Sequence, residues 1–351
     1  MVRGRVNKVI LDSYGYYLGM EKGCYIIKDR NGKTQKYPQF ETEIGEVILT
    51  SGNMVSIGAL ASFGFWNIDV LIMTKRGEPV ATLKPFDDDS HVQTRISQYE
   101  AYKNTKALEI ARTFVSSKLE GQNIILNKYG FKIHKNIEQQ IKSIKAENLV
   151  SLRKRIMHIE AMASKDYFNQ IFQLIPERIR PSNRTTLNAY DGINNIFNLA
   201  YKLLFWKCYR AIAKAHLEPY LGFLHSLEAG KPSLVCDFQE LYRYLIDDFV
   251  IRFCQKLNRK DFVMKPCVLS KKRIGKREFL NDSMTRKLNR ELQEYFRFNV
   301  EVERIRHGKK QEIETLISEE ALLFAQYLRN EKQNWIPRIP NPPKISFKLE
   351  K

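Results

Sequence analysis

The sequence predicts an α+β protein in which a small N-terminal β domain precedes a larger all-α domain. Short runs of aromatic and β-branched residues, bounded by Gly, Ser and Asp, fill the first 85 or so residues and are typical of strands. From about residue 93, apolar residues recur every three or four positions, which is the spacing of helices. A proline and an acidic run at 85–90 separate the two patterns.

These patterns divide the chain into three parts. We expect the β domain over residues 1–87 and the helical domain over 88–330. Residues 331–351 contain four prolines, a composition that favours an extended, flexible tail.

Within the β domain, strands are predicted wherever β-branched and aromatic residues cluster. The pair Asn31-Gly32 suits a hairpin turn because both residues tolerate positive φ. Apolar residues at helical spacing over 54–61 predict one short helix. An exposed sheet edge is an aggregation hazard, so pairing the edge of this domain with a second copy in a dimer is physically sensible. The expected strands are 8–12, 16–18, 25–27, 46–49 and 69–73.

The rest of the chain is predicted to be helical, with Gly and Pro as the separators between helices. The sequence shows no internal repeat of the length found in solenoid proteins. The expected helices are 93–126, 134–148, 149–173, 191–215, 236–258, 283–299 and 312–329.

Charge and cysteine usage narrow the class of protein. The chain has 58 Lys and Arg against 39 Asp and Glu, a net charge of +19 that favours a polyanionic partner. Residues 1–86 contain 11 basic and 8 acidic residues, a net of +3, which leaves +16 for the helical part. No run of about 18 apolar residues predicts a membrane span. Five scattered cysteines without a CxxC pair predict a cytoplasmic protein.

Four side chains in the helical part are candidates for chemistry: Glu160, His225, Asp237 and Glu240. Residues three apart on a helix share a face, so Asp237 and Glu240 can converge on one point. A His with two or three carboxylates suits Mg²⁺ or Mn²⁺ better than zinc. From spacing alone, the carboxylates are better explained by a solvated helix face, and the His by a packed core.

The sequence segments around these residues resemble the CRISPR-associated integrase and endonuclease family. Its members, known as CRISPR-associated protein one, are the catalytic subunit of the CRISPR adaptation complex. The resemblance spans roughly residues 5–330. It implies that Glu160, His225 and Glu240 hold the metal and that Asp237 lies against the metal or its water. Its strongest stretches are 159–168, 191–194, 219–225 and 233–243.

The resemblance also implies an activity and partners. The protein is expected to be a metal-dependent DNA integrase that inserts short captured DNA into a repeat array by 3′-hydroxyl attack on a phosphodiester. Hydrolysis, as an endonuclease, is the same chemistry with water as the nucleophile. The implied partners are captured and repeat DNA, a second copy of the chain and the small ferredoxin-like subunit of the adaptation complex, with no membrane. The alternatives are a transposon-type integrase and a catalytically silent DNA-binding scaffold.

Two basic clusters are candidates for contacts to DNA phosphates. Each phosphate that a protein neutralises steepens the salt dependence of DNA binding. A solvated surface is the competing interpretation of any such run in so basic a chain. The predicted DNA-binding residues are Arg178, Arg180, Arg184, Lys271, Lys272, Arg273, Lys276 and Arg277.

Overall fold

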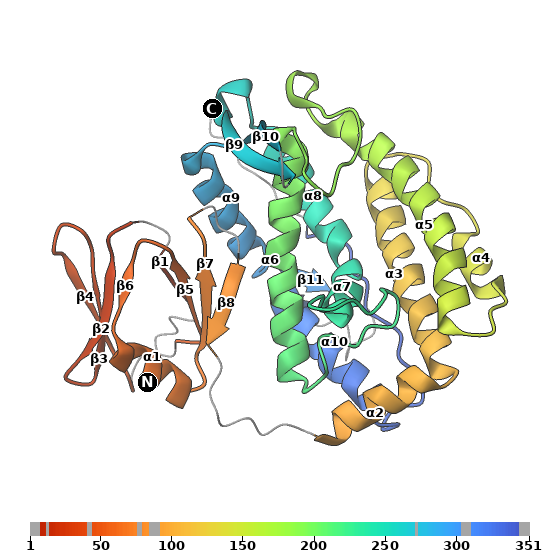
Figure 1. Ribbon diagram of the computed structural model, residues 1–351, viewed down its shortest axis with the longest axis horizontal. Helices are drawn as coiled ribbons and strands as arrows, with labels where there is room; N and C mark the ends of the chain where they lie inside the picture. The colour runs from red at the N-terminus through yellow and green to blue at the C-terminus, as the bar shows by residue number, and fades with distance from the viewer. Residues whose placement is uncertain are drawn as a thin grey trace. The chain divides into compact units, whose positions relative to one another are not determined.

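The computed structural model of the chain divides into two compact units, residues 1–90 and 91–351 (Figure 1). The division falls close to the boundary expected from the proline and acidic run. Each unit is described by itself below. The structure describes residues 8–11, 14–40, 44–75, 79–83, 92–270, 273–302 and 310–343.

In the described part of the N-terminal unit, the strands form two four-stranded sheets. One sheet has the order β1-β5-β7-β8, with β1, β5 and β7 parallel and β8 antiparallel to β7. The other has the order β4-β3-β2-β6. The strands are β1 (Lys8–Leu11), β2 (Tyr17–Glu21), β3 (Cys24–Lys28), β4 (Thr34–Pro38), β5 (Glu46–Thr50), β6 (Met54–Val55), β7 (Asp69–Met73) and β8 (Pro79–Leu83).

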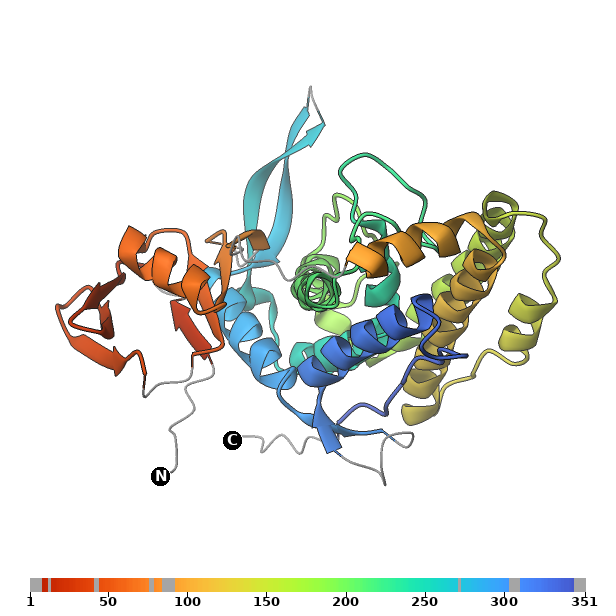
Figure 2. The same ribbon diagram turned by 90° about the horizontal axis from the view of Figure 1, so that it is seen from below.

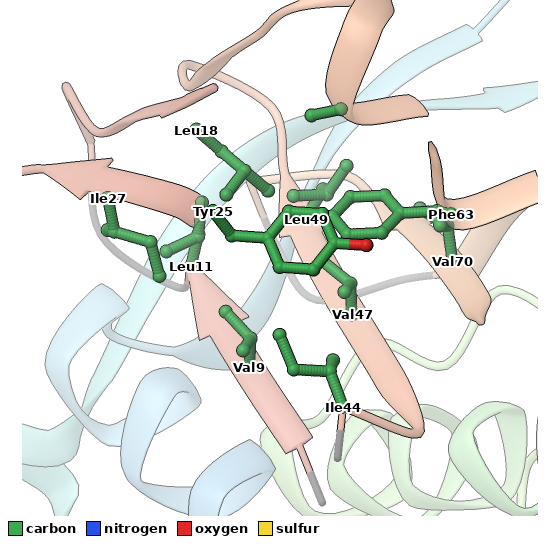
Figure 3. Close-up of a cluster of buried hydrophobic side chains, with 11 residues drawn as sticks. Val9, Leu11, Leu18, Tyr25, Ile27, Ile44, Val47, Leu49, Phe63 and Val70 are labelled. Carbon is green, nitrogen blue, oxygen red and sulfur yellow. The ribbon is translucent and has the colours of Figure 1, made fainter. Parts of the chain in front are cut away.

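Both sheets and one helix, α1 (Ile57–Phe65), contribute to a shared apolar core (Figure 3). Leu18 and Val47 come from different sheets, and the ring of Tyr25 stacks on that of Phe63 at 5.0 Å between centroids. The predicted helix over 54–61 begins three residues later because Ser56 caps it, its hydroxyl accepting from the Ala59 N–H.

The second unit is mainly helical, as the periodicity predicts. The long helices α3 and α5 pack side by side, and α6 packs against α7, α8 and α10 (Figure 1). The helices are α2 (Val92–Lys103), α3 (Lys106–Lys128), α4 (Ile137–Ser143), α5 (Leu149–Ile171), α6 (Gly192–Lys214), α7 (Ser233–Glu240), α8 (Arg243–Cys254), α9 (Asp282–Tyr295) and α10 (Ile313–Leu328).

Polar side chains set the ends of two long helices. Asn148 forms a capping box with Ser151 at the start of α5, and Asp191 accepts from the Asn194 N–H at the start of α6. The expected helix over 236–258 is in fact two helices, because the chain leaves helical hydrogen bonding at Leu241 and Tyr242. No Gly or Pro lies at this break between α7 and α8, so the sequence pattern did not predict it.

A long hairpin of β9 (Phe262–Ser270) and β10 (Arg273–Leu280) was not predicted, and it projects from the helices around it (Figure 2). Pro266 pairs with Lys276 inside this ribbon. A two-stranded ribbon leaves the outer edge of each strand unpaired, so a proline is tolerated there. A second, short ribbon pairs β11 (Asn299–Glu301) with β12 (Lys310–Glu312).

Residues 335–343 of the predicted tail are extended and make buried contacts with the helices. Glu320 on α10 is fully buried and accepts hydrogen bonds from Trp335 Nε1 and Arg338 Nε, each at 2.7 Å. The Tyr244 hydroxyl donates to the Pro340 carbonyl. Proline favours an extended backbone, and here that backbone lies packed against the helices. Residues 344–351 lie outside the described part of the chain.

No helix in the described ranges combines the length and apolar composition that crossing a membrane requires. All five cysteines are free thiols.

Candidate metal centre and nucleic-acid site

Glu160 lies near the middle of α5, on the side that faces α3. Its Oε1 accepts a hydrogen bond from Lys118 Nζ of α3 at 2.5 Å. The Glu160 side chain is 26% exposed and that of Lys118 only 9%. The packing of α3 on α5 therefore places a buried ammonium against a half-buried carboxylate.

Glu240 is the last residue of α7, and two cations flank its carboxylate. Lys118 Nζ lies 2.7 Å from Oε2, and Arg243 Nη1 donates to Oε1 at 2.7 Å. Burial opposes ionisation of Glu240, but Arg243 and Lys118 outweigh burial and hold its pKa far below the usual range. Glu240 is thus a carboxylate at any physiological pH.

Lys118 joins two of the three predicted carboxylates, because its ammonium contacts both Glu160 and Glu240. The structure therefore brings these two residues, from α5 and α7, onto one cation. Among the described residues, no group of three or more His, Cys, Asp or Glu side chains is close enough to hold a metal ion. The cation at this point is the lysine.

His225 lies in the loop before α7 and is fixed by Asp237. Its Nδ1 is 2.7 Å from Asp237 Oδ1, so the carboxylate accepts the Nδ1 proton and leaves Nε2 as the ligand nitrogen of the neutral ring. Burial opposes charging of His225, but the hydrogen bond to Asp237 outweighs it and raises the pKa of the imidazole.

Asp237 is fully buried, and its oxygens are occupied by the loop that carries His225. The N–H groups of Phe223, Leu224 and His225 donate to it at 2.6, 2.9 and 2.9 Å. A carboxylate with four such contacts orients the loop and the ring. The arrangement favours Asp237 as a positioning residue over a direct ligand.

Gly222 allows the same loop to approach α7. A Cβ at this position would lie 2.5 Å from the backbone carbonyl carbon of Ser233, the first residue of α7. From α5, Arg153 donates to the carbonyls of Phe223 at 2.9 Å and Gly222 at 3.1 Å. The helix that carries Glu160 therefore also holds the loop that carries His225.

A cavity of about 830 Å³ opens beside the two carboxylates. Its wall includes Glu160, Glu240 and one predicted DNA-binding residue, Arg184, whereas His225 and Asp237 are not part of it. Polar side chains line much of it: Lys118, Gln122, Glu160, Ser164, Lys165, Asn169, Asn183, Arg184, Thr185, Thr186, Tyr201, Glu240, Arg243 and Asp247.

Beneath Glu240, a buried polar network fixes Arg243. The Arg243 guanidinium lies over the Tyr201 ring at 4.2 Å. Tyr201 and Tyr167 both donate to Asp247, the latter at 2.8 Å. Burial raises the pKa of Asp247 to about 6 against the opposing hydrogen bonds and charges. This network keeps Arg243 in place beside Glu240.

Two of the predicted DNA-binding arginines, Arg178 and Arg180, donate hydrogen bonds to carbonyls of the protein's own backbone. Arg178 donates to the Leu257 carbonyl, and Arg180 to the carbonyls of Ile175 and Gln173. Arg184 donates to Asn194 and Asn198. Their contact with DNA stays a prediction.

The second basic cluster lies on the hairpin and its turn. Lys276 on β10 is exposed, whereas Arg277 donates to the Ala189 carbonyl. Lys271 and Lys272 lie outside the described residues, and only the backbone of Arg273 is described.

The sequence patterns did not place Lys118, Arg153 or Arg243 at the site. A pattern for Lys118 exists, since it continues the stripe of Phe114 and Gln122 at i−4 and i+4 on the buried face of α3. A lysine on the buried face of a helix needs a buried acidic partner, so this position could have predicted a nearby carboxylate.

Comparison with known proteins identifies the family. The family model described as CRISPR associated protein Cas1 matches residues 9–293. "CRISPR-associated endonuclease Cas1 1" of Archaeoglobus fulgidus is 28% identical over 272 residues, covering 70% of this chain and 76% of the relative. "CRISPR-associated endonuclease Cas1" of Korarchaeum cryptofilum is 24% identical and covers 95% of this chain and 97% of the relative.

Solved structures share the fold. A casposase bound to integration product superposes with a TM-score of 0.79 at 22% identity, covering 97% of this chain and 96% of that one. A Cas1 protein from Thermotoga maritima gives 0.72 at 20% identity, with 92% and 96% coverage. A chain of a Cas6-RT-Cas1–Cas2 complex gives 0.72 at 18% identity, covering 98% of this chain and 37% of that one.

The comparisons confirm the predicted fold class, family and enzyme class. Nucleases of this family are generally metal-dependent. With 285 of its residues spanned by the family model, from 9 to 293, the chain belongs to the Cas1 family of CRISPR-associated proteins.

Proposed function

We propose that Glu160, His225 and Glu240 hold one Mg²⁺ or Mn²⁺ ion and that the protein inserts short captured DNA into repeat DNA. In this reaction the 3′-hydroxyl of the captured strand attacks a phosphodiester of the repeat, forming a new P–O bond and displacing the 3′-oxygen of the repeat strand. When water attacks instead, the same phosphodiester bond is hydrolysed. The observation that carries the proposal is the convergence of Glu160 and Glu240 on one cationic group beside a cavity that many polar side chains border.

The donor set suits such an ion. Two carboxylates and one imidazole are ligands for Mg²⁺ and Mn²⁺, and the Lys118 ammonium already stands as a cation between the carboxylates. A bound divalent ion supplies Lewis acidity, stabilising negative charge on the phosphodiester oxygens and orienting the attacking hydroxyl.

The surrounding residues have separate tasks. Asp237 holds His225 in the tautomer with Nε2 unprotonated, and Arg153 holds the loop in place. Arg243 keeps Glu240 ionised and oriented. Arg184 in the cavity wall, together with the exposed Lys276 of the hairpin, provides positive charge for the DNA backbone.

Metal removal tests this function. We expect strand transfer of a short duplex into a repeat-containing plasmid to stop in EDTA and to return when Mn²⁺ or Mg²⁺ is restored. Strand transfer that continues in EDTA contradicts the proposal. DNA binding without any strand transfer under either ion supports a silent scaffold instead. The similarity to the casposase is a similarity of fold. It therefore does not favour the alternative of a transposon-type integrase.

The partners form the finer part of the proposal. We infer that the protein works with captured and repeat DNA in the cytoplasm and with the small ferredoxin-like subunit of the adaptation complex. The similar chain in the Cas6-RT-Cas1–Cas2 complex supports an assembly of this kind.

We also infer a homodimer through the N-terminal unit. Phe40 and Phe65 are 79% and 80% exposed, and both rings contact Trp66, with centroids at 5.8 and 5.1 Å. Three clustered exposed aromatic side chains are unusual on a surface that stays in water. A second copy of the same patch is the occupant that covers them, because a two-fold interface is self-complementary.

Replacing Phe40 and Phe65 together with Ser is expected to convert the dimer to a monomer. Burying a large apolar side chain contributes about 1.5–3 kcal/mol, and a two-fold interface loses four of them. Light scattering after size exclusion measures the mass. Leu322→Ser, which removes an apolar side chain 49% exposed on α10, is the control and should stay dimeric. A double variant that remains a dimer rules out this patch.

A further inference from the structure

Lys118 is a buried cation placed between two of the three proposed metal ligands, Glu160 and Glu240. Its ammonium lies 2.5 Å from Glu160 Oε1 and 2.7 Å from Glu240 Oε2, and its side chain is 9% exposed. An ammonium buried without a partner is costly, so the two carboxylates are what make this position tolerable. Burial opposes its charge, but Glu240 and Glu160 outweigh burial and raise the pKa of Lys118.

The charges at this point already balance. Glu160 and Glu240 carry two negative charges, and Lys118 and Arg243 carry two positive charges within direct contact of them. A divalent ion entering beside both cations meets strong repulsion, because close charges interact strongly in a partly buried site. Repulsion falls if one of the two cations leaves.

Lys118 is the cation that is able to leave. Arg243 is held by its contact with the Tyr201 ring at 4.2 Å and by Glu240. Lys118, by contrast, has a flexible four-carbon stem and borders the cavity of about 830 Å³ that also contains Gln122 and Ser164. A phosphate of DNA in this cavity offers the ammonium a new counter-ion.

From this arrangement we propose that Lys118 is an internal counter-ion that competes with the divalent metal for Glu160 and Glu240. In the absence of DNA, its ammonium holds the two carboxylates together and lowers metal affinity. When DNA enters, Lys118 moves to a phosphate and the metal site becomes available, so that DNA and metal bind cooperatively. The inference rests on the proposed metal site and adds how that site is regulated.

Calorimetric titration of Mn²⁺ into the full chain tests this idea. Lys118→Met keeps much of the stem and removes the charge, so we expect its Kd for Mn²⁺ without DNA to fall at least about tenfold below that of the wild type, a change of 1.4 kcal/mol. A short duplex should strengthen Mn²⁺ binding by the wild type and leave that of Lys118→Met nearly unchanged. Lys165→Met, which removes the same charge from the same cavity wall, should stay near the wild type.

Two further variants keep the test decisive. Lys118→Arg retains the charge, so its Mn²⁺ affinity should equal or fall below that of the wild type; tighter binding overturns the inference. Glu160→Gln should abolish Mn²⁺ binding in both the wild-type and Lys118→Met backgrounds. If it does so while Lys118→Met binds no tighter than the wild type, the counter-ion inference fails and the metal site stands. If Glu160→Gln leaves the Kd for Mn²⁺ unchanged in both backgrounds, both the metal site and the counter-ion inference fail.

Discussion

Replacing Glu160 with Gln is expected to abolish strand transfer and cleavage while the protein stays folded. Gln has nearly the same shape and can still accept the hydrogen bond from Lys118, but it lacks the charge that a divalent ion requires. Losing several kcal/mol of transition-state stabilisation corresponds to a rate decrease of about 10³-fold or more. Single-turnover strand transfer with Mn²⁺ measures this loss.

Asp166→Asn is the matched control for Glu160→Gln. Asp166 lies on the same helix, is 59% exposed and accepts from Gln170, away from the cavity wall. We expect its strand-transfer rate to stay within about twofold of the wild type, because surface changes of this kind have small effects. Unchanged activity in Glu160→Gln would remove Glu160 from the metal site.

Replacing Asp237 with Asn is expected to damage both the fold near the site and metal binding. The carboxylate accepts from three backbone N–H groups and from His225, whereas an amide offers one oxygen and turns an NH₂ group toward donors. Each hydrogen bond to a charged group contributes about 1.5–3 kcal/mol, so we expect a loss of stability of about 3 kcal/mol or more.

Metal affinity separates the roles that Asp237 could have. A residue that orients a ligand typically changes metal affinity by about 10–100-fold when it is replaced. Urea unfolding and Mn²⁺ titration of Asp237→Asn measure both effects. Glu228→Gln, an exposed carboxylate in the same loop, is the control for both. Complete loss of Mn²⁺ binding with unchanged stability argues for a direct ligand instead.

Much of the fold followed from periodicity, because long amphipathic helices such as α3, α5 and α6 carry a strong pattern. The β9–β10 hairpin did not, since Pro266 and Gly275 are poor strand residues and the basic run around its turn is typical of a loop. The C-terminal prolines pointed to flexibility, but the buried anchors Trp335 and Arg338 depend on Glu320, far away in the sequence.

The candidate site was predicted only from the sequence motifs that resemble the family. Spacing placed Asp237 and Glu240 on one helix, but it gave no sign that Asp237 faces the His225 loop while Glu240 faces Lys118. The joining of α5, α7 and the loop at one place comes from helix packing, which local patterns do not specify. Lys118 and Arg153 were missed for the same reason.

The central claim is that Glu160, His225 and Glu240 share one divalent ion. A crystal structure of the protein soaked in Mn²⁺, with anomalous scattering recorded at the manganese edge, tests it directly. We predict one strong peak bound by the carboxylates of Glu160 and Glu240 and by Nε2 of His225, with Asp237 still accepting from the loop. A peak located elsewhere, or no peak while the Lys118 ammonium stays between the two carboxylates at saturating Mn²⁺, would contradict the claim.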